Sequence, residues 1–309
     1  MTRALAIASR EDTPAVQEVP TAGPGAGEVS VRVEAASVNG FDAAVAAGYV
    51  WGMIPHEFPV VLGRDFAGEV DSVGEGVTDR AVGERVAGVI TGMTLDRGAI
   101  IESLSVPAGS LFTVPENLTS AQAAAVGLAG LTAVALVEAL DLSASDSLLV
   151  SGATGGVGSL AVQLAAATGA TVLATTRAEA ADFVTDLGAT IAIDYTDDLE
   201  AAVAKAVPGG LTAVVHAAGD AATLAGLLAP GGRLASALGA TNEAVGRDDI
   251  TVTGVMAAPA AEHLPRLLAQ VADGTLVVPV AATYPFDQAA EALAAFGGHK
   301  LGKLVVTVA

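Results

Sequence analysis

The stretch LLVSGATGGVGSLAVQLAAATGATVLATTR, residues 148–177, decides the fold of this chain. It begins with a short apolar run, turns at a cluster of glycines, continues as an apolar segment of helical length and ends in a second short apolar run. A strand, a glycine turn, a helix and a second strand make up the repeating unit of parallel α/β sheets. The sequence therefore predicts a strand–helix–strand unit over these residues.

The glycine turn GATGGVG has the features of a phosphate-binding loop. Gly152 and Gly155 allow a tight turn, Gly156 lets backbone amides approach an anion, and Gly158 lets the helix pack close to the sheet. The free N–H groups at the start of the helix then favour a pyrophosphate. Ala153 occupies the first glycine position of the usual G-x-G-x-x-G pattern, and a turn that needs glycine only for its shape is the alternative. The position between two strands favours dinucleotide binding.

The end of the second strand indicates which dinucleotide is bound. NAD-binding units carry an acidic residue here, which accepts a hydrogen bond from the ribose 2′-hydroxyl. This chain has Thr175, Thr176 and Arg177, whose hydroxyls and guanidinium suit a 2′-phosphate. We therefore predict NADPH as the cofactor. The alternatives are that Arg177 is a solvated residue at a helix start, or that nearby Glu179 shifts the preference toward NADH.

Outward from this stretch, the chain divides into two regions. Residues 1–117 contain short alternating runs separated by Gly and Pro, which predict a partly open β-barrel. Residues 119–140 form an apolar, alanine-rich helix that Thr119 or Ser120 can cap. The final LVVTV is a strand with no helix after it, which can return to the barrel. The strands expected in one parallel sheet are 148–151, 171–175, 190–193, 212–217, 232–237 and 250–255.

Composition removes several classes of function. The 309 residues include no cysteine, which excludes disulfides, thiolate catalysis, iron–sulfur clusters and cysteine-ligated zinc. A formal charge of −20 disfavours nucleic acid as a partner. The N-terminal segment lacks the apolar core and cleavage site of a signal peptide, so we expect a cytoplasmic protein. The closest approach to a membrane span is expected at 160–173, which is too short, so no membrane partner is predicted.

The whole chain resembles the medium-chain dehydrogenase/reductase superfamily, and within it the zinc-less quinone oxidoreductase (zeta-crystallin-like) branch. The stretches that carry the resemblance are ASVNGFDAAVAAGYV, FPVVLGRDFAGEVDSVGEGV, GERVAG, GAIIESLSVPAGSLFTVPENLT, GLAGLTA, SGATGGVG, LGATIAIDY, LAPGGRLASALG and LGKLVVTV. The resemblance implies an α/β fold of two domains with the active site in the cleft between them. Residues 1–117 with 259–309 would form a GroES-like partly open β-barrel, and residues 118–258 a Rossmann domain with a doubly wound, parallel six-stranded sheet.

The resemblance also bears on metal. Where zinc alcohol dehydrogenases of the superfamily have a zinc-binding histidine, this chain has Arg64, and the cysteine-bearing structural-zinc lobe is missing. Without a soft ligand set we predict no metal site. Of the four histidines, His216 is expected to be a packed, hydrogen-bonded residue at a strand end.

The resemblance implies a set of site residues. Asn39 and Asp42 match an element that lines the cleft, and Tyr49 matches a tyrosine near the nicotinamide. Candidate cofactor contacts are Thr132, Gly155, Gly156, Val157, Gly158, Thr175, Thr176, Arg177, Tyr195, Leu238, Gly239, Val255 and Lys303. As catalytic candidates we take the Asn39 amide and the Tyr49 hydroxyl, which could hydrogen-bond an oxygen that gains charge on hydride addition. A helix-capping role for Asn39 and a packing role for Tyr49 are the alternatives.

The predicted function is an NADPH-dependent, zinc-independent reductase that transfers hydride to a quinone. One alternative is an enone or enoyl reductase acting on a carbon–carbon double bond conjugated to a carbonyl, which uses the same motifs. A further alternative is a non-catalytic NADPH-binding protein. Because an apolar strand at 250–256 would lie at the edge of the sheet, we also predict a homodimer that pairs through it.

Overall fold

The computed structural model describes residues 1–92, 94–95, 97–256 and 262–308. The domain boundary predicted between 258 and 259 lies outside the described residues. The strands are β1 Thr2–Ile7, β2 Ala15–Val19, β3 Glu28–Val38, β4 Val60–Val61, β5 Asp65–Val73, β6 Arg85–Val89, β7 Ser103–Pro107, β8 Leu111–Thr113, β9 Ser147–Ser151, β10 Thr171–Thr176, β11 Ile191–Asp194, β12 Leu211–His216, β13 Leu228–Ser236, β14 Thr251–Gly254, β15 Val280–Pro285 and β16 Lys303–Thr307.

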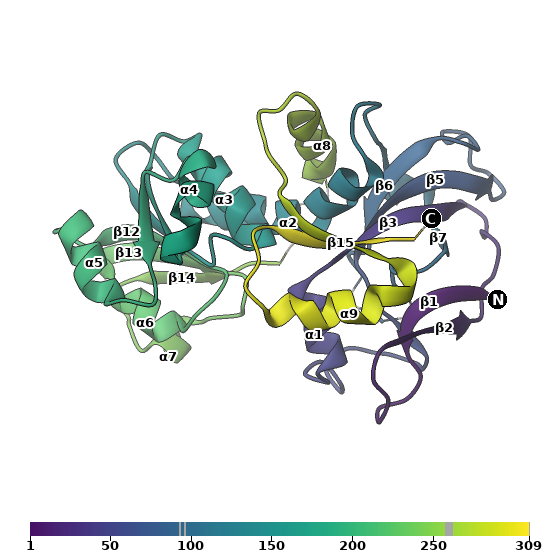
Figure 1. The fold of residues 1–309 in the computed structure, drawn as a ribbon, viewed down its shortest axis with the longest axis horizontal. Helices are drawn as coiled ribbons and strands as arrows, with labels where there is room; N and C mark the ends of the chain where they lie inside the picture. Colours follow the sequence, from purple (N-terminus) through teal and green to yellow (C-terminus); the bar gives the residue numbers. More distant parts are fainter. Residues whose placement is uncertain (93, 96, 257–261, 309) are drawn as a thin grey trace.

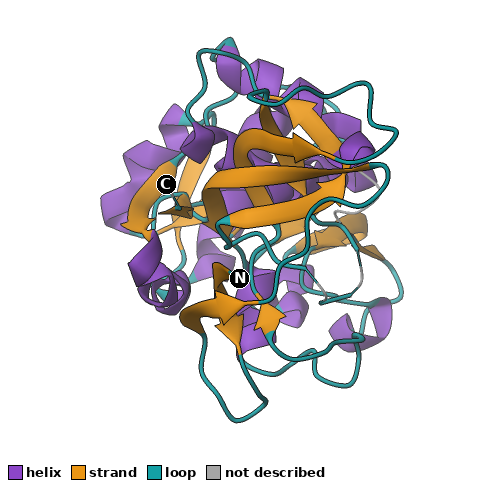
Figure 2. Ribbon diagram, turned by 90° about the vertical axis from the view of Figure 1, so that its right-hand side faces the viewer, coloured by secondary structure: helices purple, strands orange, loops and turns teal. Residues whose placement is uncertain are grey.

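The helices join these strands into two units. The α-helices are α1 Gly40–Ala46, α2 Ser120–Leu140, α3 Gly156–Ala166, α4 Ala181–Asp186, α5 Leu199–Ala206, α6 Ala221–Gly226, α7 Asn242–Val245, α8 Leu264–Ala272 and α9 Ala289–Ala294. Figure 1 shows the unit with β9–β14 on one side and the strand-rich unit, with both chain ends, on the other. Figure 2 shows the strand-rich unit from its outer side.

The first unit is a Rossmann domain. Its six strands are parallel and lie in the order β11-β10-β9-β12-β13-β14, the order of the dinucleotide-binding fold. Both faces of the sheet are covered, because Leu148 and Val150 of β9 face one apolar core while Leu149 between them faces another. This explains why the strands read as continuous apolar runs. The predicted parallel six-stranded sheet and its opening strand–turn–helix unit are confirmed.

The second unit is the expected partly open barrel. Its main sheet runs β15-β16-β3-β5-β6-β8, with β7 also paired to β3, and a smaller sheet runs β2-β1-β4. The last strand, β16, pairs antiparallel with β3, so the two ends of the chain build one unit (Figure 1). Its side chains alternate, with Leu304 and Val306 in the barrel core and Val305 in the core shared with α2. The predicted return of the final strand is confirmed.

Helix α2 packs against both units. Thr119 caps it, accepting a hydrogen bond from Gln122 N at 3.2 Å while Gln122 Oε1 accepts one from Thr119 N at 3.0 Å. Its 21 residues are long and apolar enough to cross a membrane, so the longest apolar segment is here and not at 160–173 as expected. Two thirds of its apolar window (67%) is buried inside the molecule, which is typical of a core helix.

Helix α8 packs on α2. Leu264, Leu267 and Leu268 point into the core that contains Leu131 of α2. This helix belongs to the segment 259–309, which we assigned to the barrel, yet its apolar face lies against the helix that opens the Rossmann region.

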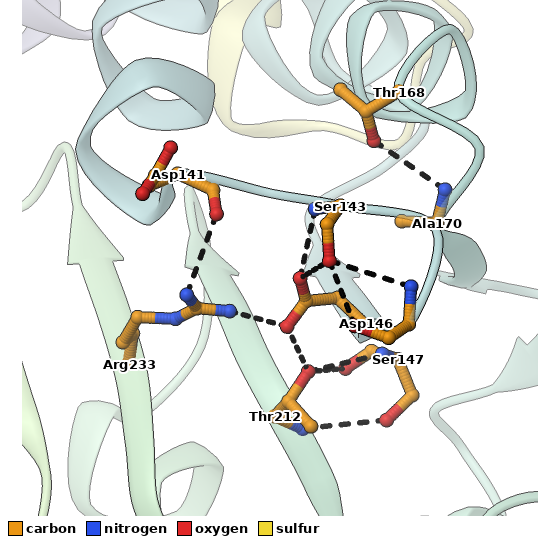
Figure 3. Close-up of polar contacts among 9 residues, drawn as sticks. Asp141, Ser143, Asp146, Ser147, Thr168, Ala170, Thr212 and Arg233 are labelled. Carbon is orange, nitrogen blue, oxygen red and sulfur yellow. Dashed lines mark hydrogen bonds and ion pairs between the residues drawn. The ribbon is translucent and has the colours of Figure 1, made fainter.

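A polar cluster ties the amino-terminal ends of the Rossmann strands together (Figure 3). Asp146, just before β9, accepts hydrogen bonds from Thr212 Oγ1 at 2.8 Å and from Ser143 N at 2.8 Å, and it forms an ion pair with Arg233 of β13. Burial alone would raise the pKa of Asp146, but these hydrogen bonds and the Arg233 charge hold it below its usual range. The cluster lies at the opposite ends of the strands from the glycine turn, so its role is to stabilise the fold.

Candidate active site

A cavity of about 720 Å³ lies between the two units. It opens at the carboxyl ends of β9 and β12, where the strand order of the Rossmann sheet reverses, the usual position for a ligand in this fold. The Rossmann domain contributes residues of 151–158, 175–177, 195–199 and 217–224, and the barrel contributes residues of 38–40 and 296–304.

The glycine turn forms one wall of this cavity. Gly152 N donates to Thr175 Oγ1 at 3.0 Å, which fixes the turn to the next strand. A Cβ on Gly158 would lie 2.1 Å from the Gly152 carbonyl oxygen, so only glycine allows α3 to start this close to β9. Gly155 precedes α3 without a side-chain cap, and the N–H groups of the first turn therefore face the cavity without intrahelical partners. This arrangement fits a pyrophosphate.

Arg177 and Tyr195 lie together at one end of the cavity. Arg177 Nε donates to the Tyr195 hydroxyl at 3.1 Å, and Glu179 is 4.0 Å from the same guanidinium. The two side chains come from the ends of neighbouring strands, β10 and β11. The two predicted residues are thus brought together, with the carboxylates of Glu179 and Asp194 near the guanidinium.

The two threonines of the ATTR segment have other partners. Thr175 lines the cavity, but its hydroxyl donates to Val150 O at 3.3 Å and accepts from Gly152 N. Thr176 is buried and donates to Arg177 O at 3.1 Å, and it does not line the cavity. The Thr175 hydroxyl therefore holds the glycine turn and the Thr176 hydroxyl bonds within its own segment, which leaves Arg177 as the charged side chain of this segment that lines the cavity.

A buried polar network forms the opposite wall. Lys303 Nζ donates to Asn39 Oδ1 at 2.5 Å and to Val38 O at 2.9 Å. Asn39 Nδ2 donates in turn to Asp65 Oδ1 at 3.1 Å and to Ser37 O at 3.2 Å. Asp65 also accepts from Ser37 Oγ at 2.7 Å and, through Oδ2, from a backbone N–H of α2. The network joins β3, β5, β16 and α2 directly below the cavity.

Two charged groups of this wall have shifted pKa values. Burial raises the pKa of Asp42 to about 6, against the opposing effect of hydrogen bonds from Asn39 N at 2.8 Å and Gly63 N at 2.9 Å. Burial lowers the pKa of the Lys303 ammonium, and the nearby carboxylates of Asp65 and Asp42 offset part of that effect. Asp42 also bonds the Asn39 N–H at the start of α1, which matches the capping alternative for Asn39.

Of the two predicted hydrogen-bond donors, Asn39 lines the cavity and Tyr49 does not. Both Nδ2 hydrogens of Asn39 are used inside the protein, so a substrate oxygen would have to displace Asp65 or Ser37 O. Tyr49 is 75% exposed in the turn after α1 and does not line the cavity. The resemblance could not predict where either side chain points. The direction of Asn39 depends on hydrogen bonds within the network, and that of Tyr49 depends on the path of the 47–54 turn.

Four further predicted cofactor contacts do not line the cavity. Thr132 donates to Leu128 O within α2 at 2.7 Å. Leu238 and Gly239 follow β13, with Leu238 59% exposed, and Val255 follows β14. The last three follow the carboxyl ends of their strands, at the same end of the sheet as the glycine turn. Their contacts with a cofactor stay predictions.

The Arg64 side chain is held by hydrogen bonds to backbone carbonyl oxygens and by an aromatic ring. Its guanidinium donates to Gly92 O at 2.8 Å and Ile90 O at 3.3 Å, and it lies 4.1 Å from the centre of the Phe41 ring. The described part of the chain contains no group of three or more His, Cys, Asp or Glu residues placed to hold a metal. A cationic side chain at this point and a chain without cysteine do not fit a zinc ion.

His216 is satisfied on both ring nitrogens, as expected. Nδ1 lies 3.0 Å from Ser236 Oγ and Nε2 lies 3.1 Å from Gly219 O.

Several cavity residues escaped the sequence analysis. Ser151 lines it from the end of β9, Asp220 from the segment AAGD after β12 and Thr223 from the first turn of α6. The switch-point rule applied to the ends of β9 and β12 would have found Ser151 and Asp220. Lys300 lines it from the loop before β16, where no local pattern marks a site, and His299 lines it beside Lys300.

Comparisons with known proteins agree with this geometry. Residues 25–116 match the family described as "Alcohol dehydrogenase GroES-like domain", and residues 187–306 match the family described as "Zinc-binding dehydrogenase". The "Chloroplast envelope quinone oxidoreductase homolog" of Arabidopsis thaliana is 30% identical over 305 residues, which cover 94% of this chain and 92% of that protein. A "Mycocerosic acid synthase-like polyketide synthase" of Mycolicibacterium smegmatis is 32% identical over 92% of this chain but over 14% of its own length.

Solved structures are similar over the full length. A quinone oxidoreductase from Coxiella burnetii has a TM-score of 0.89 and 25% identity, covering 100% of this chain and 99% of that one. An NAD-dependent alcohol dehydrogenase has a TM-score of 0.88 and 28% identity, covering 99% and 100%. A mycobacterial protein complexed with NADPH has a TM-score of 0.85 and 27% identity, covering 100% of both chains.

Proposed function

The chain belongs to the medium-chain dehydrogenase/reductase superfamily as a quinone oxidoreductase-like oxidoreductase, and from this premise we propose that it is an NADPH-dependent reductase of quinones that works without zinc. The observation that carries the proposal is the single cavity that runs from the Arg177–Tyr195 pair, past the glycine turn, to the buried Lys303–Asn39 network. It offers a binding position for each part of a dinucleotide and an end where a small acceptor can lie between the two units.

The preference for NADPH rests on Arg177. Its guanidinium is oriented by the Tyr195 hydroxyl and lies at the cavity end opposite the network, where a 2′-phosphate could be paired. One similar solved structure is described as NAD-dependent and another as complexed with NADPH. The proposed preference for NADPH over NADH therefore rests on this chain's own residues. Glu179, 4.0 Å from Arg177, and Asp194, whose charge also acts on Arg177, are the groups that would weaken it.

The residues that would hold the cofactor are the α3 N-terminus with Gly155–Gly158, then Arg177 and Tyr195. When bound, NADPH supplies a hydride to the acceptor. The protein must then orient the acceptor, keep water away and place hydrogen-bond donors near the oxygen that gains charge. Because Arg64 stands at the position of the zinc-binding histidine and the chain has no cysteine, the residues around the cavity do not fit a zinc ion, and the proposed reaction uses no metal.

A second acceptor class is favoured by one finding. The region that matches the polyketide synthase covers nearly the whole of this chain, at slightly higher identity than the quinone oxidoreductase homolog. A carbon–carbon double bond conjugated to a carbonyl is therefore the alternative acceptor. Both acceptors place negative charge on a conjugated oxygen after hydride addition.

Turnover assays distinguish these functions. NADPH oxidation is followed with a small quinone and, separately, with a matched cyclic enone, and both are repeated with NADH. Turnover of the quinone supports the proposal, and turnover of the enone alone moves the function to double-bond reduction. NADPH binding without reduction of either acceptor would indicate a non-catalytic NADPH-binding protein.

Arg177→Ala tests the cofactor preference. Loss of a charge-assisted contact with a phosphate should weaken NADPH binding by about tenfold to a hundredfold, while NADH binding changes little. Dissociation constants from nicotinamide fluorescence provide the measurement. Arg10→Ala, which removes an exposed arginine outside the cavity, is the matched control. Equal losses for both cofactors would show that Arg177 does not read the phosphate.

A further inference from the structure

Lys303 is an ammonium group buried in the wall of the reaction cavity. It is 4% exposed, yet none of the carboxylates in the described residues forms an ion pair with it. Two of its N–H groups donate to Asn39 Oδ1 and Val38 O. Burying a charge without an ion pair is costly, and ionisable groups buried in the wall of a cavity are enriched at functional sites.

The side chain of Lys303 is held along its whole length. A Cβ on Gly156 would lie 2.3 Å from Lys303 Cδ, so the aliphatic stem passes directly over the glycine turn. The other end is fixed by the Asn39 side chain, which Asp65 orients. The glycine at 156 thus makes room for a lysine from the last strand, and the ammonium is held between the cofactor turn and the barrel.

The other candidate donors near this wall are committed elsewhere. Asn39 gives both amide hydrogens to Asp65 and Ser37 O, and Tyr49 lies outside the cavity. Lys300 lines the cavity mouth, but its ammonium donates to Phe296 O and lies over the Phe296 ring. Lys303 retains a third N–H, and it lines the cavity next to Gly155 and Gly156.

We propose that Lys303 is a catalytic residue of the reductase, whose third N–H bonds the carbonyl oxygen of the acceptor and then gives it a proton. The inference rests on the proposed function and names the proton donor of that same site. The acceptor gains two electrons and one hydrogen with the hydride, which leaves a negative charge on its oxygen. An Nζ–H bond then breaks as the O–H bond forms, and the neutral amine takes a proton from water.

The electrostatic surroundings suit this role. The titratable groups that face Lys303 are Asp42 from α1, Asp65 from β5 and Lys300 from its own segment. The glycine turn on the other side adds none. Burial lowers the pKa of Lys303, which brings it closer to neutral pH, where a general acid works best.

Lys303→Met tests the role. Methionine keeps the apolar stem and removes the ammonium, so we expect kcat for either acceptor to fall by about a hundredfold or more. The dissociation constant for NADPH, measured by fluorescence without any acceptor, should change by less than about threefold. Lys205→Met removes an exposed lysine on α5 and is the matched control.

The chain's lack of cysteine allows a chemical rescue that remains informative even if the methionine variant fails to fold. Lys303→Cys introduces the only thiol of the protein. The unfolded variant is alkylated with 2-bromoethylamine, which rebuilds a lysine-length ammonium, or with iodoacetamide, which adds a neutral amide of similar size, and each product is refolded. Only the ammonium product should recover activity. Because the sulfur lowers the basicity of the new amine, the basic limb of its kcat profile should move to lower pH than in the wild type.

The outcomes separate the two proposals. A wild-type protein that reduces neither acceptor overturns the proposed function and this inference with it. An active wild type, with a Lys303→Met variant that keeps kcat but loses NADPH affinity, overturns the inference alone and makes Lys303 a cofactor contact. Equal rescue by the neutral amide would also overturn it, because shape and not charge would then be required.

Discussion

Asp42 shows how strongly one buried carboxyl depends on its surroundings. It lies at 1% exposure beneath the cavity, accepts two backbone N–H groups and shares the wall with Asp65 and Lys303. The hydrogen bonds favour the charged form, while burial and the nearby Asp65 charge favour the neutral form. Burial is the largest of these effects, so the pKa rises to about 6.

This shift predicts a pH dependence of stability with a definite sign. A carboxyl whose pKa is higher in the folded than in the unfolded state contributes stability in full below the unfolded value near 4, and that contribution is lost as pH rises through about 6. The change amounts to about 3 kcal/mol. We expect Asp42→Asn to remove it, so that the difference between the two proteins' free energies of unfolding changes by this amount from ~1 pH unit below the unfolded pKa to ~1 pH unit above the folded pKa.

Urea unfolding at a series of pH values measures this difference, with the exposed Asp71→Asn as control. The pH dependence is the diagnostic quantity, because asparagine also loses one backbone hydrogen bond at all pH values. Parallel curves for the wild type and Asp42→Asn would contradict the prediction.

At single positions, the sequence predicted what the backbone requires better than what side chains do. The glycines of the turn could be identified because the need for residues without a Cβ is visible as a local cluster of glycines in the sequence. Gly158 is needed because a Cβ there would clash with the Gly152 carbonyl oxygen. The contacts of Asn39 and Lys303 join residues 264 positions apart, and no local pattern encodes them. Lys303 was predicted as a cofactor contact, and its bond to Asn39 became visible only in the fold.

At the scale of elements, β9, β12 and β13 show how the parallel sheet is held together at the amino-terminal ends of its strands, away from the cavity. The Asp146 cluster in Figure 3 joins the turn after α2 to β12 through Thr212 and to β13 through Arg233. Register at this end also determines where the opposite ends of the strands, which carry the cavity, are positioned. The cluster therefore supports the site from the far edge of the sheet.

Asp146→Asn should destabilise the protein by about 1–3 kcal/mol at pH 7, because a buried charge-assisted set of hydrogen bonds is lost. Since the folded pKa of Asp146 is depressed, its contribution is present above the unfolded value and disappears as pH falls through the folded value. The difference between variant and wild type should therefore shrink in acid. Thermal or urea unfolding at pH 7 and near pH 3 measures it, with exposed Asp186→Asn as control. A constant difference across this range would refute the electrostatic account.

Secondary structure was predictable to the extent that it follows apolar periodicity. The six Rossmann strands and α2 appear within a few residues of their expected positions, because continuous apolar runs mark elements buried on both faces. The packing of α8 on α2 was not predictable, since its apolar face fits any neighbouring core.

For the whole molecule, charge distribution agrees with an anionic cofactor. The chain carries a formal charge of −20, and only three lysines occur in it. Two of them, Lys300 and Lys303, line the cavity together with Arg177, whereas Asp220 is the acidic residue of the lining. Cationic side chains gathered in the cavity of an otherwise acidic chain favour the anionic cofactor that we propose.

The edge of the Rossmann sheet bears on the predicted homodimer. Strand β14 pairs with β13 on one side, where Val255 N bonds Ser236 O at 2.9 Å. Because backbone groups alternate in direction, Ile250 O and Val252 N point away from β13, and the Asn242 side chain bonds both of them. The edge is therefore partly covered, which the sequence did not reveal.

We propose that two copies pair through β14 with release of the Asn242 side chain, since a continuous ladder would replace its two bonds. Asn242→Ala should then tighten the dimer, because nothing has to be displaced. Gly254→Pro removes an outward N–H from the edge and should favour the monomer.

Light scattering coupled to size-exclusion chromatography, over a range of protein concentration, distinguishes a mass of 30.2 kDa from twice that value. A wild-type monomer that dimerises only as Asn242→Ala would show that the asparagine protects the edge, and monomers throughout would place any assembly elsewhere on the molecule.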